Sequence, residues 1–162
     1  MAQVYVAIGS NINKEENIRG AVRALATAFG PLILSPVYES EAHGFKGGNF
    51  YNLVAGLNTM KSIDHIKTAI SEIETRFGRR RKSNHMTSRT VDLDLLLYDD
   101  VVRHDCYVNL PHPDIQRYAF VLRPLADIAP ALKHPATGVT LSEMWRQFDS
   151  KSAALRGVDL KF

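Results

Sequence analysis

The stretch RTVDLDLLL, residues 89–97, sets two carboxylates into an otherwise apolar run that predicts a β-strand. Side chains alternate between faces along a strand, so Asp92 and Asp94 share one face, about 7 Å apart, while alternate leucines share the other. Paired carboxylates are costly unless something balances them, and Mg²⁺ accepts carboxylates together with substrate phosphates. A plainer interpretation leaves both aspartates in water on an exposed sheet face. The leucines expected to face the core are Leu93, Leu95 and Leu97.

The rest of the first hundred residues alternates between strand and helix patterns. Apolar residues recur at helical spacing from Ile18 to Phe29, and Ser62 can cap a second helix that Gly78 ends. With the strands, the order is β-α-β-β-α-β, which predicts an α+β, ferredoxin-like sandwich. The expected strands are Gln3–Gly9, Leu32–Ser40, Phe50–Thr59 and Thr90–Tyr98.

The remainder, Val101–Phe162, carries five prolines and predicts a C-terminal extension of short helices and loops on the sheet edge. Its last ten residues are expected to form a loosely held tail. No repeat or linker divides residues 1–162, so we expect a single domain. The one cysteine, Cys106, suits a reducing compartment, and no signal-peptide pattern or membrane-length apolar run is present. We therefore expect a cytoplasmic protein with no membrane partner. A monomer is a separate expectation, which no sequence pattern decides.

Basic residues concentrate just before the paired aspartates. The net charge is only +3, yet six lysines and arginines fall within the fourteen residues from Arg76 to Arg89. This cluster predicts a polyanionic partner, either nucleic acid or nucleotide phosphates, although a solvated basic face is the plainer alternative. No phosphate-loop or kinase glycine-loop motif occurs, so side chains must bind the phosphates. His112, between two prolines, is a further candidate nucleotide contact, and the histidine spacing does not suit zinc. The candidate phosphate ligands are Arg79, Arg81, Lys82 and Arg89.

Several segments together resemble the 6-hydroxymethyl-7,8-dihydropterin pyrophosphokinase family. The most specific are R-T-x-D-L-D at Arg89–Asp94 and F-V-L-x-P-L-x-D-I-A-P at Phe120–Pro130. The family's fold is ferredoxin-like, in agreement with the element order. The other matching segments, in the family's order, are A-I-G-S-N at Ala7–Asn11, F-Y-N at Phe50–Asn52, E-x-x-x-G-R-x-R-K at Glu74–Lys82 and P-H at Pro111–His112.

The resemblance implies a folate-pathway enzyme that transfers the β,γ-pyrophosphoryl group of ATP to the hydroxymethyl oxygen of the pterin and releases AMP. It implies two Mg²⁺ ions held by Asp92 and Asp94, with Arg79 and Arg89 assisting the chemical step. Phosphoryl transfer suits such a site because it needs charge compensation and little covalent work from the protein. The implied ATP site comprises Glu74, Arg81, Lys82 and His112, and the implied pterin site comprises Gly9, Ser40, Phe50, Asn52 and Phe120.

Three places depart from the family's pattern. Met86-Thr87-Ser88 stands where tryptophan-glycine-proline is usual, and Ser40–Gly44 replaces a threonine-proline-proline type segment. Tyr118 occupies the place of an arginine. The metal and phosphate residues therefore match better than the acceptor and lid residues, which leaves open a diverged pyrophosphokinase with a different acceptor alcohol.

Two other classes of function are alternatives to an enzyme of this kind. A nucleic-acid-binding ferredoxin-like domain needs exposed aromatic residues on its central strands, whereas the first expected strand offers Tyr5 and the fourth only Tyr98. The two aspartates would also repel phosphate, so a nucleic-acid partner is not expected. A non-catalytic module would bind nucleotide or pterin and be stabilised by it, but would release no AMP.

Overall fold

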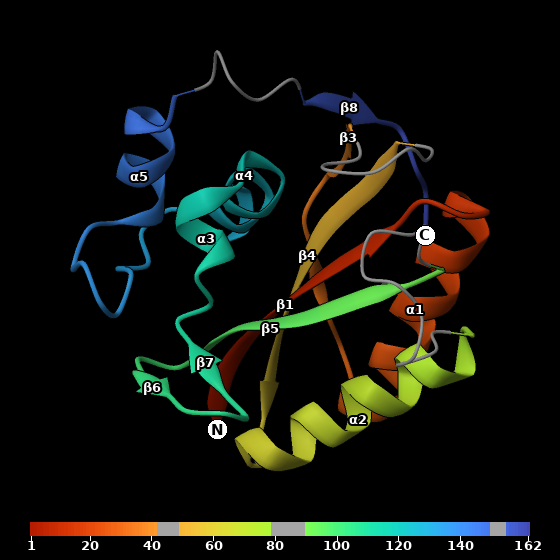
Figure 1. Cartoon of the computed structure of the whole chain (residues 1–162), viewed down its shortest axis with the longest axis horizontal. Coiled ribbons are helices and arrows are strands. Elements are labelled where there is room, and N and C mark those ends of the chain that lie inside the picture. The colour runs from red at the N-terminus through yellow and green to blue at the C-terminus, as the bar shows by residue number, and fades with distance from the viewer. Residues whose placement is uncertain (42–48, 79–89, 150–154) are drawn as a thin grey trace.

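The computed structural model describes residues 1–41, 49–78, 90–149 and 155–162 (Figure 1). Within these ranges no helix combines the length and the apolar character needed to cross a membrane. The elements run β1 (Ala2–Ser10), α1 (Lys14–Phe29), β2 (Ile33–Leu34), β3 (Val37–Ser40), β4 (Phe50–Thr59), α2 (Ile63–Arg76), β5 (Asp92–Tyr98), β6 (Arg103–His104), β7 (Asn109–Leu110), α3 (Asp114–Arg117), α4 (Ala119–Ile128), α5 (Leu141–Gln147) and β8 (Arg156–Val158).

The main sheet has the order β5-β1-β4-β3-β8, with β2 also paired to β4, and its pairings are antiparallel. Helices α1 and α2 cover one face of this sheet (Figure 1). Ile18 and Leu25 of α1 and Ile66 of α2 pack there with Val6 and Ile8 of β1. Two helices on one face of an antiparallel sheet confirm the predicted α+β, ferredoxin-like arrangement.

Helix α2 begins and ends as its sequence predicts. The Ser62 hydroxyl accepts a hydrogen bond from the backbone N–H of His65 at 3.2 Å, which satisfies one of the unpaired donors of the first turn. Gly78 follows the helix with a φ of 86°, a left-handed conformation that favours glycine. Both ends of α2 are therefore defined by local interactions, and its C-terminal end lies close to the strand that carries the two aspartates.

The helices of the C-terminal extension cover the opposite face of the sheet, so the expectation that they pack on its edge is wrong. Leu122 and Leu125 of α4 are buried together with Tyr5 of β1 and Val54 of β4. The β6–β7 hairpin does lie against the edge strand β5. Both faces of the sheet are thus buried, because the extension supplies the apolar surface that the first hundred residues lack.

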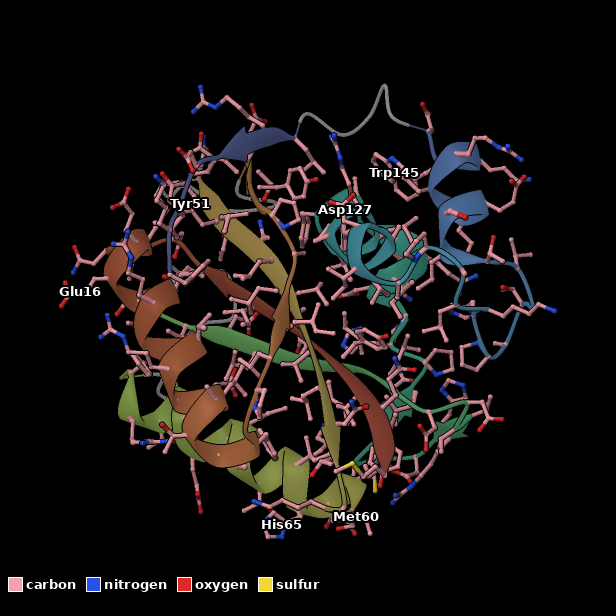
Figure 2. The ribbon with its side chains drawn as sticks, turned by 180° about the vertical axis from the view of Figure 1, so that it is seen from behind. Glu16, Tyr51, Met60, His65, Asp127 and Trp145 are labelled. Atoms are coloured by element: carbon pink, nitrogen blue, oxygen red, sulfur yellow. The ribbon has the colours of Figure 1, made fainter. Side chains whose placement is uncertain are left out.

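A polar and aromatic cluster joins α4, α5 and β3 on that second face. The Arg123 guanidinium lies 4.7 Å from the ring centroid of Tyr38 and 5.6 Å from that of Trp145. The Tyr38 hydroxyl hydrogen-bonds the Asp127 carboxylate. Figure 2 shows Asp127 and Trp145 on the same side of the sheet. These contacts fix the position of α4, whose first turn forms part of the site described below.

The predicted strand Leu32–Ser40 is divided into β2 and β3. Pro36 has no N–H to donate to a sheet, which accounts for the break. Ser35 takes part in its place, because its N–H donates to Val54 O and its hydroxyl accepts from Val54 N, both at 2.9 Å. The break redirects the chain so that β3 runs on to Ser40.

The C-terminal residues are held more firmly than the sequence suggested. Strand β8 pairs with β3, and Arg156 forms an ion pair with Glu39 of that strand. The Arg19 side chain also donates to Lys161 O at 2.9 Å. The expected loose tail is therefore wrong for residues 155–162.

Strand β5 contains an irregularity that the alternation of its side chains did not predict. Val6 pairs with Leu95 but Tyr5 pairs with Leu97, so Leu96 is an extra residue in the ladder. Leu97 consequently packs with Tyr5 in the core between the sheet and α4, whereas Leu93 and Leu95 pack beneath α1 and α2. The expectation that all three leucines share one face is wrong for Leu97.

Candidate active site

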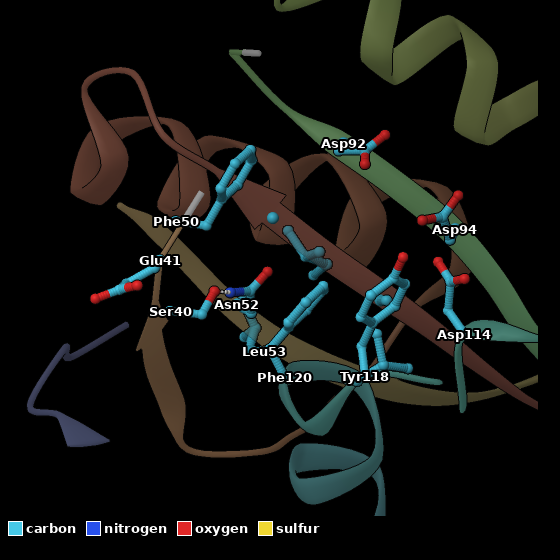
Figure 3. A pocket seen from close by; sticks show the side chains of 14 residues that line it. Ser40, Glu41, Phe50, Asn52, Leu53, Asp92, Asp94, Asp114, Tyr118 and Phe120 are labelled. Carbon is cyan, nitrogen blue, oxygen red and sulfur yellow. Dashed lines mark hydrogen bonds between the residues drawn. The ribbon is translucent and has the colours of Figure 1, made fainter. Parts of the chain in front are cut away.

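A cavity of about 200 Å³ lies where β1, β4 and β5 meet the first turn of α4. Figure 3 shows aromatic rings on two sides of it and carboxylates along a third. Seven of the predicted site residues contribute to its lining, although they come from segments far apart in the sequence. These residues are Gly9, Ser40, Phe50, Asn52, Asp92 and Asp94, and Phe120 joins them from α4.

The floor of the cavity is polar and closely packed. The Asn52 side-chain amide donates to the Ser40 hydroxyl at 2.7 Å, and both residues are buried. Gly9 pairs with Asn52 across β1 and β4, and a Cβ added at Gly9 would lie 3.1 Å from Asn52 Oδ1. The absence of a side chain at Gly9 therefore leaves room for the amide oxygen, which faces the cavity as a hydrogen-bond acceptor (Figure 3).

The aromatic sides of the cavity come from two elements that are far apart in the sequence. Phe50, at the start of β4, stands across the cavity from Phe120 of α4 (Figure 3). The ring of Phe120 is stacked on that of Tyr118, with centroids 4.9 Å apart and ring planes 19° from parallel. A flat ring held between such surfaces gains stacking on both faces.

The two aspartates open onto this cavity from the edge strand. Asp92 pairs with Gly9 and Asp94 with Ala7, so both carboxylates lie on the same face of the sheet as the polar floor. The Asp94 side chain is 41% exposed, which leaves its oxygens accessible. Two accessible carboxylates on one face provide the hard oxygen ligands that Mg²⁺ prefers, so the residues present fit that ion.

His112 is oriented by the turn that precedes α3. The backbone N–H of Asp114 donates to His112 Nδ1 at 3.1 Å, so the proton of a neutral ring resides on Nε2. Burial lowers the pKa of His112, against the opposing effect of the Asp114 carboxylate, and the neutral form is thereby favoured. Nε2 lies 3.9 Å from Asp94 Oδ1.

Possible ligand atoms of Asp94, His112 and Asp114 lie within 4.8 Å of one another. A ring nitrogen that carries a proton cannot bind a metal ion, so His112 is better suited to donate a hydrogen bond to an anion. A phosphate oxygen beside Asp94 would be such an anion.

Glu74 does not line the cavity but contacts the strand that carries the two aspartates. Its carboxylate accepts a hydrogen bond from Leu93 N, between the two aspartates, at 3.0 Å. The remaining predicted residues lie outside the described ranges, and along the described lining of the cavity there is no lysine or arginine. Those outside the described ranges are Arg79, Arg81, Lys82 and Arg89, together with Met86–Ser88.

The sequence did not single out Asp114 as a site residue, and it noted Glu41, within Ser40–Gly44, and Tyr118 only as departures from a pattern. All three line the cavity. Asp114 follows His112 by two residues, and this spacing within a proline-rich turn was the one available signal. Helix α3, which Asp114 begins, has only four residues and leaves no periodic pattern to detect.

Comparison with known proteins gives consistent matches. A family model described as 7,8-dihydro-6-hydroxymethylpterin-pyrophosphokinase matches residues 5–130. The 2-amino-4-hydroxy-6-hydroxymethyldihydropteridine pyrophosphokinase of Aquifex aeolicus is 33% identical over 145 residues, which cover 88% of this chain and 90% of the relative. The protein of the same name from Pseudomonas aeruginosa is 36% identical over 140 residues, or 82% and 84% of the two chains.

Longer proteins also match. Folic acid synthesis protein fol1 of Schizosaccharomyces pombe is 36% identical over 155 residues, but this chain spans only 21% of its length. A solved Plasmodium falciparum HPPK-DHPS chain superimposes with a TM-score of 0.74 at 13% identity, covering 93% of this chain and 44% of that one. At that identity the likeness concerns the fold alone.

Proposed function

The chain belongs to the 7,8-dihydro-6-hydroxymethylpterin-pyrophosphokinase family, and on this premise we propose that it transfers pyrophosphate from ATP to 6-hydroxymethyl-7,8-dihydropterin. The hydroxymethyl oxygen forms a bond to the β-phosphorus of ATP, and its O–H bond breaks as the proton is released to solvent. The bond between that phosphorus and the oxygen bridging to the α-phosphate breaks, and AMP leaves. The products are AMP and the pterin pyrophosphate, as the folate pathway requires.

One observation carries this proposal above all: a single cavity joins an aromatic slot with a polar floor to a pair of accessible carboxylates. The slot between Phe50 and Phe120 suits a flat pterin ring, and the Asn52 oxygen can accept from an N–H at the ring's edge. A ring placed there directs its substituent toward Asp92 and Asp94. The acceptor alcohol and the phosphates then meet at that end of the cavity.

Asp92 and Asp94 would hold the divalent cations, which we propose are two Mg²⁺ ions. When bound, such ions neutralise phosphate charge and polarise the acceptor hydroxyl. His112 offers its Nε2–H to a phosphate oxygen. Arg79, Arg81, Lys82 and Arg89 supply the cations that the described lining lacks, with Arg79 and Arg89 acting on the transferred group.

The structure bears on two alternatives, a nucleic-acid-binding domain and a pyrophosphokinase with a different acceptor alcohol. Tyr5 is only 5% exposed beneath α4, so it cannot stack on a nucleic-acid base. A different acceptor alcohol has one observation in its favour, because Tyr118 lines the cavity where the family pattern has an arginine. A panel of pterin alcohols with longer side chains would identify such an acceptor by its higher rate.

We further propose that residues 1–162 form one domain that acts as a monomer in the cytoplasm. The single unpaired cysteine is compatible with a reducing compartment. Light scattering of the purified protein would test the monomer, since a mass of twice 18.1 kDa would contradict it.

The reaction is tested by incubating the protein with ATP, Mg²⁺ and 6-hydroxymethyl-7,8-dihydropterin and separating AMP from ADP. We expect AMP release that requires both the pterin and the metal. A folded protein that binds ATP with Mg²⁺ but releases no AMP would refute the proposed activity. AMP release without pterin would indicate simple hydrolysis instead.

A further inference from the structure

We propose that Glu74 is a positioning residue, which holds the strand segment that carries the two aspartates instead of binding the nucleotide. Its carboxylate lies 3.0 Å from the backbone nitrogen of Leu93, the residue between Asp92 and Asp94. This inference rests on the proposed pyrophosphoryl transfer only in its kinetic consequences. The contact itself is a property of the protein without substrates.

The location of Leu93 explains why a partner is needed. β5 is an edge strand of the sheet, and Leu93 pairs with Ile8 of β1. Successive residues of an antiparallel strand direct their N–H groups to opposite sides. Since Leu93 N–H bonds Glu74, it points away from β1, where a sheet would continue if β5 were a central strand. A strand segment whose backbone N–H and C=O groups lack partners at a sheet edge separates readily from the sheet. Glu74 supplies the acceptor that a further strand would provide.

Helix stability does not account for an acidic residue at this place. Glu74 lies in the last turn of α2, which ends at Arg76, and the negative end of a helix dipole disfavours a carboxylate. The hydrogen bond to Leu93 offsets this cost, because a bond from an N–H to an ionised acceptor is stronger than one between neutral groups. The position is therefore explained by what Glu74 contacts across the structure.

The contact links the end of α2 to the strand segment that carries both aspartates. Glu74 precedes Gly78, which ends α2, and Arg79 follows directly in the sequence. Through Leu93 N–H, the end of α2 is fixed to the same three residues that present both cation ligands. Loss of the contact is expected to loosen the aspartates and so weaken cation binding, while leaving nucleotide affinity at saturating Mg²⁺ nearly unchanged.

Three variants test this role: Glu74→Ala removes the acceptor, Glu74→Gln keeps an acceptor without the charge, and Glu72→Ala alters an exposed glutamate of the same helix. Amide hydrogen exchange of Leu93 in the substrate-free protein measures the contact directly. We expect exchange about ten-fold faster or more in Glu74→Ala, and near the wild-type rate in the other two.

The kinetic measurement is the Mg²⁺ concentration that gives half-maximal AMP release at saturating ATP and pterin. We expect it to rise several-fold in Glu74→Ala and to recover in Glu74→Gln. Unchanged Leu93 exchange in Glu74→Ala would overturn the proposal, as would a large loss of ATP affinity at saturating Mg²⁺ in Glu74→Ala and Glu74→Gln alike. If the wild type releases no AMP, the proposed reaction fails, yet the exchange of Leu93 still decides the role of Glu74.

Discussion

Replacing Gly9 by alanine tests whether the floor of the cavity sets acceptor affinity. The added Cβ would lie 3.1 Å from Asn52 Oδ1 and 3.9 Å from a ring carbon of Phe50. Gly9 does not have a positive φ, so the substitution adds no backbone strain. The amide of Asn52 must instead move by a few tenths of an ångström.

The size of the effect follows from what holds that amide. Asn52 is tied to Ser40 by a buried 2.7 Å hydrogen bond, so the shift must weaken this bond or turn the Oδ1 atom away from the ligand. Loss of one such bond costs about 1 kcal/mol, which corresponds to roughly a five-fold rise in KM for the pterin. Because Asp92 and Asp94 are unaffected, kcat should stay close to the wild-type value.

The assay is AMP release as a function of pterin concentration at saturating ATP and Mg²⁺. Gly157→Ala is the matched control, because a Cβ there meets nothing within 4 Å. A wild-type KM in Gly9→Ala would refute the reasoning, since it would mean that the Asn52 amide yields freely or does not contact the acceptor. A fall in kcat at unchanged KM would refute it as well, by placing Gly9 in the chemical step.

Three further predictions concern the proposed metal ligands, the core between α4 and the sheet, and a buried histidine. Asp94→Asn should lower kcat at least about a hundred-fold while leaving the midpoint of thermal unfolding nearly unchanged. Asp100→Asn, at an exposed position, is the control. Near-normal turnover in Asp94→Asn would contradict the assignment of Asp94 to a cation site. Leu125→Ala should cost about 2–5 kcal/mol of unfolding free energy in urea titrations, because Leu125 is fully buried between α4 and the sheet, and a negligible cost would mean that α4 is not part of the core. Burial lowers the pKa of His134, whose Nδ1 accepts hydrogen bonds from Ala136 N and Thr137 N. The contribution of His134 to the free energy of unfolding is therefore complete above about pH 6.5 and is lost as the pH falls through the lowered native pKa. His134→Asn should flatten this pH dependence of stability, and an equally steep loss of stability in acid would contradict the assignment.

The elements that the sequence predicted are those in which local chemistry and tertiary packing agree. In α2, the buried isoleucines recur at helical spacing behind a serine cap, so the local pattern is also the buried face. Strand β8 has no such signal, because Arg156 and Gly157 favour a strand only when β3 is beside them. Its formation depends on a partner more than a hundred residues away, which no local pattern records.

The site divides in the same way. The shared face of the paired aspartates follows from strand alternation, and the residues proposed to bind the pterin follow from motifs that resemble a known family. The contact between Asn52 and Ser40 depends on the register of β3 against β4, and that register is fixed by the break at Pro36. The sequence identified these residues as site members but could not show that one orients the other.

The bulge in β5 shows how an irregularity builds the site. Because Leu96 is an extra residue opposite β1, its carbonyl is available to accept from His112 N at 3.0 Å. This bond fixes the proline-flanked turn against β5, and Asp114 N–H then orients the ring so that Nε2 lies 3.9 Å from Asp94 Oδ1. A perfectly alternating strand would have kept Leu97 on the first core face and left the turn without this anchor. The same irregularity that breaks the alternation of side chains therefore places a neutral histidine donor beside Asp94, the proposed cation ligand, where we expect His112 to bind a phosphate group that the cation also contacts.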